Sequence, residues 1–277
     1  MNIAAIIMVA CYGASMVLYF IYLFLQHDRL YRSGRYAFTA GFICHCLLLG
    51  LQIAACGHIP AFTLSQALFV SGWALAGVFL ALHRKLNLNF FGIYVAPLTL
   101  FIVLAALLLP DAPDPKAAGL NDWPQNLWLM SHIITIFIGD AALALAGGAG
   151  VFYLVQERAI KNKKRGFFYR RLPPLELLDR AGYACLVVGF IMLTIGLITG
   201  MVYAELIWGR FWAWDPKEVW SGITWLVYAA LLHERLAVGW RGRRAAIMAI
   251  LGLGVLLFTF LGVNFLLEGH HGVFTRV

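Results

Sequence analysis

Eight apolar runs, each long enough to cross a bilayer as a helix, dominate this sequence and limit what it can fold into. Crossing a hydrocarbon core of about 30 Å takes about 20 helical residues, and only helices and closed barrels satisfy their backbone polar groups there. These runs predict an all-α integral membrane protein, a bundle of about eight transmembrane helices forming a single polytopic membrane domain over residues 1–277. The runs cover 3–25, 38–57, 64–83, 91–109, 128–156, 180–203, 218–236 and 244–267.

The composition agrees with a membrane protein. Hydrophobic residues make up 62% of the chain and charged residues 12%, whereas soluble domains average about 25% charged residues. The formal net charge of +8 is spread over short loops between the apolar runs, and no nucleic-acid-binding motif accompanies it. We therefore expect a lipid bilayer around the chain and no nucleic-acid partner.

The basic residues predict an orientation. If the first helix starts outside, the inner segments with the adjoining helix ends hold all but four of the 21 Lys and Arg residues. Such an excess marks the cytoplasmic side of a membrane protein. We therefore expect both termini on the outer side, together with the tryptophan-rich segment described next. The four exceptions are Lys116, Arg210, Lys217 and Arg276.

The segment 208–218, with the sequence WGRFWAWDPKE, carries the strongest local signal. Its indoles, Trp208, Trp212 and Trp214, belong either to an aromatic belt at the membrane interface or to a platform for a flat ligand. A belt requires neither Gly209, which permits close backbone approach, nor Asp215, whose step to proline redirects the chain. The segment therefore favours a ligand platform.

Histidines on the same predicted side suggest which ligand. His132 lies about one turn into the fifth run, and His270 and His271 follow the eighth. Two neutral imidazoles on opposite faces of a flat platform are what axial ligation of haem iron requires. A zinc site is less favoured because the outer side lacks a cluster of suitable ligands.

The other candidate residues leave alternatives open. His233 lies about 22 Å along the seventh run from Glu218, near the inner side, where it is either functional or part of an interfacial polar cluster. His45 fits a core histidine bonded to a carbonyl, and His83 fits a contact at a helix end. Asp140 either orients the surroundings of His132 or pairs with a neighbouring helix.

The five cysteines form no C-x-x-C pair. The chain therefore lacks both a thioredoxin-like redox motif and a C-x-x-C-H haem attachment motif. If it holds haem, we expect a non-covalent haem b.

The segment 208–218 and the following VWSGITWLVYAALLHERL resemble the tryptophan-rich "WWD" signature of haem-handling membrane proteins. The resemblance is to the cytochrome c biogenesis branch called CcsA or ResC, a subunit of the system II holocytochrome c synthase. It extends to GHIPAFTLSQAL at 57–68, which lacks the family's acidic residue, and to GVNFLLEGHHG at 262–272. In the latter, the family histidine falls on His271.

The resemblance implies a function and a set of site residues. His132 and His271 would ligate the iron of an external haem, and His233 would ligate haem at the inner leaflet with a second ligand from a CcsB (ResB)-like membrane subunit. Haem would cross the membrane and be presented for thioether attachment to the Cys-x-x-Cys-His motif of apocytochromes c. The external haem would rest on Trp208, Gly209, Trp212, Trp214 and Asp215. The implied location is a bacterial inner or thylakoid-type membrane.

Other functions share these features. A haem exporter or chaperone of the same family would carry the tryptophan segment and the histidines without attachment activity. A non-catalytic membrane assembly factor would lack stable haem after purification. An unrelated transporter with a tryptophan belt would be unaffected by loss of His132 and His271. Whether the chain acts as an enzyme subunit therefore depends on the site.

Overall fold

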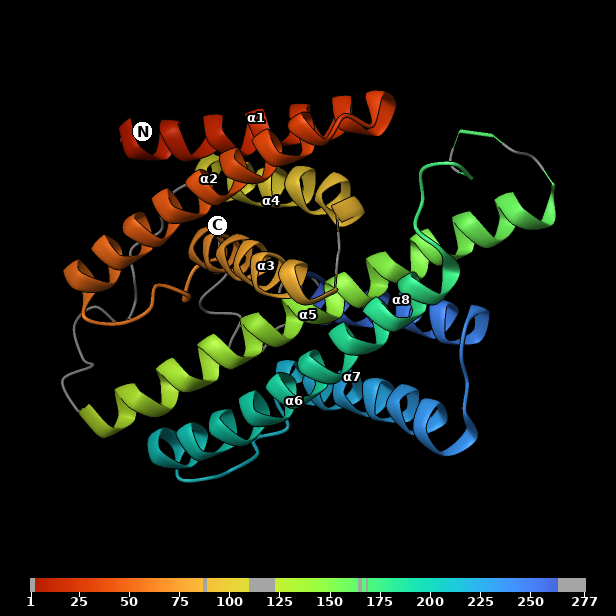
Figure 1. The fold of residues 1–277 in the computed structure, drawn as a ribbon. Helices are drawn as coiled ribbons and strands as arrows, with labels where there is room; N and C mark the ends of the chain where they lie inside the picture. Colours follow the sequence, from red (N-terminus) through yellow and green to blue (C-terminus); the bar gives the residue numbers. More distant parts are fainter. Residues whose placement is uncertain (1–2, 87–88, 110–122, 164–165, 168, 264–277) are drawn as a thin grey trace. The chain divides into compact units, whose positions relative to one another are not determined.

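A computed structural model describes residues 3–86, 89–109, 123–163, 166–167 and 169–263. Within these ranges the chain forms eight α-helices and no strand, which confirms the predicted all-α class (Figure 1). The helices are α1 (Ile3–Leu25), α2 (Asp28–Cys56), α3 (Leu64–Leu86), α4 (Gly92–Leu108), α5 (Trp123–Lys161), α6 (Leu175–Trp208), α7 (Pro216–His233) and α8 (Arg243–Leu257).

Each predicted run corresponds to one helix. Six helical stretches are long and apolar enough to span a membrane, within α1, α2, α3, α5, α6 and the helical segment that starts with α8. α4 is shorter at 17 residues, and α7 has 18. α2 begins at Asp28, ten residues before its predicted start, because a polar first part continues the same helix. α8 extends into a π-helical turn, Phe258–Gly262.

The helices group into two compact units, Met1–Asn126 and Leu127–Arg276. In the first unit, α1 packs against α2 and α4, and α3 packs against α2 and α4. Aromatic side chains fill this core, where Phe38 contacts both Tyr12 of α1 and Phe79 of α3. The ring of Tyr19 occupies the space beside Gly92, where a Cβ atom would approach it to 2.5 Å.

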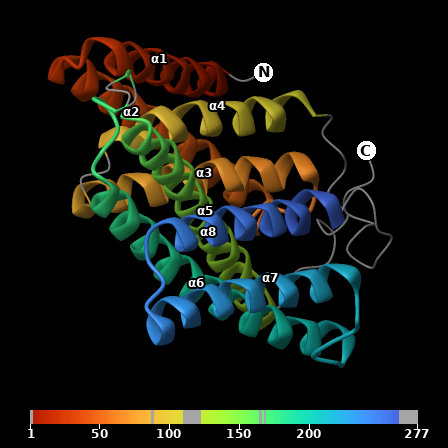
Figure 2. The same cartoon turned by 90° about the vertical axis from the view of Figure 1, so that its right-hand side faces the viewer.

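The second unit contains α5 to α8, and α7 contacts both α6 and α8 (Figure 2). Glycines allow α5 to approach its neighbours at backbone distance. A Cβ atom on Gly139 would lie 3.0 Å from the backbone nitrogen of Leu193 on α6, and one on Gly150 would lie 2.7 Å from the carbonyl oxygen of Ala246 on α8. Small residues at helix interfaces are typical of membrane proteins, where close packing replaces the hydrophobic effect.

This packing predicts opposite effects for two glycine-to-alanine changes. Gly150→Ala is expected to destabilise the protein by about 1–3 kcal/mol, because the backbone of α8 must move away. Gly254→Ala is expected to raise stability slightly, because no atom lies within 4 Å of the added methyl group and alanine favours a helix. The thermal unfolding midpoint in detergent checks both. Equal midpoints for the two variants would contradict the α5–α8 contact.

Candidate functional site

The tryptophan segment forms the irregular connection between α6 and α7. α6 ends at Trp208, and Gly209 follows in the left-handed conformation with φ of 66°, its N–H donating to the carbonyl of Glu205. This is the usual glycine stop of a helix. α7 then starts at Pro216, the first helical position, where the missing N–H of proline has no cost.

Two carboxylates hold the start of α7. The Asp215 side chain accepts a hydrogen bond from the backbone nitrogen of Lys217 at 2.9 Å. The carboxylate of Glu218 reaches back and accepts from the backbone nitrogens of Ala213 at 2.8 Å and Asp215 at 3.3 Å. Together they form a capping box, which satisfies backbone donors that a helix leaves open at its N-terminus. Asp215 is buried at 4% exposure, so its carboxylate shapes the segment from within.

The capping box fixes how the indoles are presented. Trp214 has φ of 58°, a left-handed conformation that is rare for a bulky residue, and its side chain is 79% exposed. The ring of Trp212 lies edge to face with that of Trp214, with centroids 6.1 Å apart. Strained backbone of this kind is concentrated at functional sites. The segment thus holds one indole outward and one against the protein.

Trp212 also carries a buried polar group. Among the described residues, no acceptor forms a hydrogen bond with its Nε1 atom, although that atom is inaccessible to solvent. A Cβ atom on Gly222 of α7 would lie 3.5 Å from the far edge of the same ring, so the indole lies against the first turns of α7. Buried indole N–H groups usually have an acceptor, so this donor is suited to a polar group of a ligand.

His132 has a defined orientation on α5. Its Nδ1 atom lies 2.7 Å from the carbonyl oxygen of Gly196 on α6, and since a carbonyl only accepts, Nδ1 must donate. The neutral ring therefore carries its lone pair on Nε2, the arrangement found in metal-ligating histidines. A Cβ atom on Gly200 would lie 2.7 Å from Nδ1. The imidazole of His132 thus packs against α6 at Gly196 and Gly200.

This contact between His132 and α6 lies close to the tryptophan segment along the helix. Gly200 precedes Trp208 by eight residues, which is about 12 Å along a helix. On another side of α5, the ring of Phe137 lies 6.1 Å from that of Phe260, which follows α8. The chain therefore leaves the described part of α8 beside the helix that carries His132. His270 and His271 lie outside the described residues.

Two further contacts bind the end of α8 to the start of α7. The hydroxyl oxygens of Thr224 and Thr259 are 2.7 Å apart, and the ring of Phe258 lies 4.5 Å from that of Trp220. Consequently α5, the end of α6, the start of α7 and the end of α8 meet at one end of the second unit. That end holds His132 and the segment 208–218.

Charged groups at the start of α7 also involve α5. The ammonium group of Lys217 interacts electrostatically with the carboxylates of Asp215 and Asp140. Asp140 lies two turns past His132 on α5. Lys217 thereby links the tryptophan segment to α5.

The remaining predicted histidines lie elsewhere. His233 ends α7 with an exposed side chain, directly before a π-helical turn, Glu234–Val238. His45 is fully buried, with Nε2 donating to the carbonyl of Phe69 at 3.1 Å and Nδ1 lying 3.2 Å from the hydroxyl of Tyr12. It is thus a core histidine of the first unit, as the sequence predicts. His83 is buried, and its Nε2 bonds the hydroxyl of Tyr31.

Sequence reasoning missed three site residues. Glu218 was counted in the segment but not recognised as the second half of a capping box, although Asp215 and Glu218 have the required spacing. Gly196 and Gly200 were not singled out. Their signal is the sequence GLITG inside an apolar helix, a spacing that marks close approach between membrane helices.

The Asp215 cap predicts the effect of two substitutions. Asp215→Ala is expected to lower stability by about 1 kcal/mol, because the backbone donor of Lys217 loses its acceptor. Asp215→Asn retains a side-chain oxygen and is expected to stay close to the parent protein. Thermal unfolding in detergent measures both changes, and an equal loss in Asp215→Asn would show that charge, not capping, is the relevant property.

The backbone of Trp214 predicts a gain in stability on substitution. Trp214→Gly is expected to raise the stability of the protein by about 1 kcal/mol, because glycine adopts a positive φ without strain. Trp214→Ala is the matched control, since it removes the indole but keeps a Cβ atom. A midpoint for Trp214→Gly no higher than that of Trp214→Ala would contradict the strain.

Comparisons with known proteins agree on one family. The family described as "Cytochrome C assembly protein" matches residues 61–271. The chain is 36% identical over 240 residues to the cytochrome c biogenesis protein CcsA of Guillardia theta, covering 81% of this chain and 80% of that protein. It is 34% identical over 271 residues to CcsA of Synechococcus elongatus, covering 83% of each.

A solved structure shares the fold. The structure described as "Cytochrome c Heme Lyase CcmF" superposes with a TM-score of 0.67 at 18% identity, over 99% of this chain. This chain spans 47% of the length of that protein. At this identity the match speaks for the helical architecture alone.

Proposed function

This chain belongs to the cytochrome c assembly protein family, and on that premise we propose that it presents haem for covalent attachment to apocytochromes c. Haem is the cargo, bound non-covalently as haem b at the end of the second unit that holds His132 and the segment 208–218. The observation that carries the proposal is the hydrogen bond that Nδ1 of His132 donates to the Gly196 carbonyl, because it fixes the tautomer whose lone pair is on Nε2.

The surrounding groups suit the rest of a haem. The exposed indole of Trp214 and the neighbouring Trp208, 39% exposed, offer apolar faces to a porphyrin. The buried Nε1 of Trp212 is a donor for a propionate oxygen. Gly209 and Asp215 set the backbone path of the segment. His271 supplies the second axial ligand, and the contact between Phe137 and Phe260 supports this, because it holds the last described part of the chain before His271 against α5.

The attachment step then requires little from the protein beyond position. The S–H bond of each cysteine in a Cys-x-x-Cys-His motif adds across one haem vinyl group, so that sulfur bonds one carbon and hydrogen passes to its neighbour. The histidine of that motif replaces one of the two axial ligands on the iron. Holding the macrocycle edge-outward against the indoles exposes the vinyl groups and raises the effective concentration of the reactants.

His233 serves a second site at the other end of α7. Its exposed side chain is available to a haem that is also held by a ligand from a CcsB-like membrane subunit. The excess of Lys and Arg in the segments near this end supports its location on the cytoplasmic side. Haem thus enters near His233 and is presented near His132, with both termini on the outer side of a bacterial inner or thylakoid-type membrane.

The external ligands predict a spectroscopic result. The complex co-expressed with its CcsB-like partner is expected to show a low-spin, b-type haem spectrum. His132→Ala and His271→Ala are each expected to weaken this signal or convert it to high spin, because one axial ligand is lost. Reduced-minus-oxidised absorption spectra of the purified complex measure the change.

His27→Ala is the matched control for these variants. His27 is exposed and its Nδ1 lies 2.8 Å from the Leu25 carbonyl in the first unit, so the spectrum is expected to be unchanged. A parent spectrum retained in both His132→Ala and His271→Ala would remove the ligand assignment. It would leave an assembly factor without haem ligation as the better account.

A further inference from the structure

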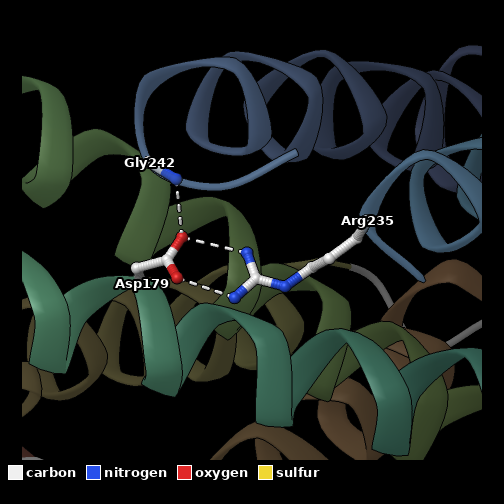
Figure 3. A network of polar contacts seen from close by, with 3 residues as sticks. All are labelled: Asp179, Arg235 and Gly242. Atoms are coloured by element: carbon white, nitrogen blue, oxygen red, sulfur yellow. Dashed lines mark hydrogen bonds and ion pairs between the residues drawn. The ribbon is translucent and has the colours of Figure 1, made fainter. Parts of the chain in front are cut away.

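A part-buried ion pair joins three elements at the end of the second unit opposite the tryptophan segment. The two oxygens of Asp179, on α6, accept from the two terminal nitrogens of Arg235 at 2.9 and 2.7 Å (Figure 3). Oδ1 also accepts from the backbone nitrogen of Gly242 at 2.9 Å. The side chains are only 11% exposed for Arg235 and 18% for Asp179. Both oxygens of Asp179 thus accept from Arg235, and Oδ1 accepts from Gly242 as well.

A second contact holds the guanidinium group. It lies 4.5 Å from the ring centroid of Tyr183, one turn after Asp179 on α6. Arginine both forks around a carboxylate and stacks on an aromatic ring, which lysine does not do equally well. Arg235 is therefore anchored toward α6 by its planar shape as well as by its charge.

Arg235 stands two residues after His233, within the π-helical turn Glu234–Val238. Residues two apart on a helix point to nearly opposite sides, since each residue turns the chain by about 100°. With Arg235 directed into the unit, His233 is directed out of it, and its side chain is indeed exposed. π-helical turns are often found at functional sites.

The inner side of this helix end has no room for a large ligand. The cavity beside the ion pair measures about 30 Å³ and is lined largely by alanine and glycine, together with Tyr153, Tyr183, Asp179 and Arg235. This volume holds about one water molecule. Any planar ligand of His233 therefore lies on the exposed side of α7, and the direction of the imidazole decides whether it can bind.

We propose that Asp179 and Arg235 are positioning residues for the inner haem ligand, fixing the rotation of the end of α7 so that His233 faces outward. This inference rests on the proposed role of His233. Ion pairs buried in a protein add little net stability compared with apolar residues, and their best-attested use is to select one arrangement. The hydrogen bond from the backbone nitrogen of Gly242 to Asp179 connects the start of α8 to the same ion pair.

The test uses the complex with the CcsB-like partner and the variants His233→Ala, Asp179→Asn, Arg235→Gln and Arg235→Lys. Asp179→Asn and Arg235→Gln are expected to lower occupancy of the inner haem about 10-fold, the lower end of the loss seen when groups that orient a metal ligand are removed. Arg235→Lys is expected to fall in the same direction because it loses the fork. Absorption spectra of the purified complex, compared at equal protein, measure the occupancy.

Imidazole rescue distinguishes positioning from folding. Added imidazole is expected to restore the low-spin signal in His233→Ala and in Asp179→Asn, because a diffusing ligand needs no helix to orient it. Lys161→Gln is the matched control. It removes an ion pair with Glu157 at 2.8 Å whose lysine is 59% exposed, and it is expected to leave the spectrum unchanged.

Three results would overturn the inference. Full inner haem in both Asp179→Asn and Arg235→Gln, with loss in His233→Ala, would reject the positioning role and leave the proposed function intact. Loss in Asp179→Asn that imidazole does not restore would reduce the ion pair to a folding contact. An unchanged spectrum in His233→Ala would reject the proposed inner site, and the positioning role with it.

Discussion

The start of α7 imposes the requirement on which the rest of the site depends. A helix that begins at a membrane surface exposes backbone N–H groups, and hydrocarbon cannot satisfy them. Here Asp215 and Glu218 do so from within the segment, and Pro216 removes one donor altogether. Because both carboxylates are committed to the backbone, the intervening chain follows one path. That path places Trp214 in a left-handed conformation with its indole exposed.

Two glycines of α6 determine how His132 is oriented in the candidate site. Gly196 and Gly200 bring the backbone of α6 to the ring of His132, so that a carbonyl determines which nitrogen carries the proton. The tautomer of His132 is therefore determined by the packing of α5 against α6. At the other end of α7, the bidentate ion pair of Arg235 and Asp179 lies two residues from His233, which we propose it orients. His132 on α5 and His233 at the end of α7 are the two histidines that we propose bind the same cargo.

Much of the fold could be predicted from the sequence because hydrophobic length is a strong signal. All eight apolar runs became helices, and α1 kept its predicted bounds, Ile3–Leu25. The start of α2 was missed because helices continue past the hydrocarbon, where polar residues such as Asp28 carry no hydropathy signal. The division into two compact units also escaped notice, since the packing of helices depends on small residues scattered along them.

The sequence singled out the residues of the candidate site, but it did not predict the contacts that hold them in place. Trp214 and His132 stood out by type and by predicted side. The sequence predicts Asp215 in a ligand platform, and the structure shows that it also caps α7. Capping depends on backbone geometry at one position, which residue type alone does not reveal. The tautomer of His132 likewise follows from a carbonyl 64 residues away.

We propose that His132 offers Nε2 to haem iron beside the indoles of the segment 208–218. The most direct measurement is an experimental structure of the complex isolated with haem. The account predicts density joining the iron to Nε2 of His132, with the porphyrin against Trp214 and the Nδ1 bond to Gly196 retained. Iron bound elsewhere in the complex, with His132 directed away from the porphyrin, would contradict it.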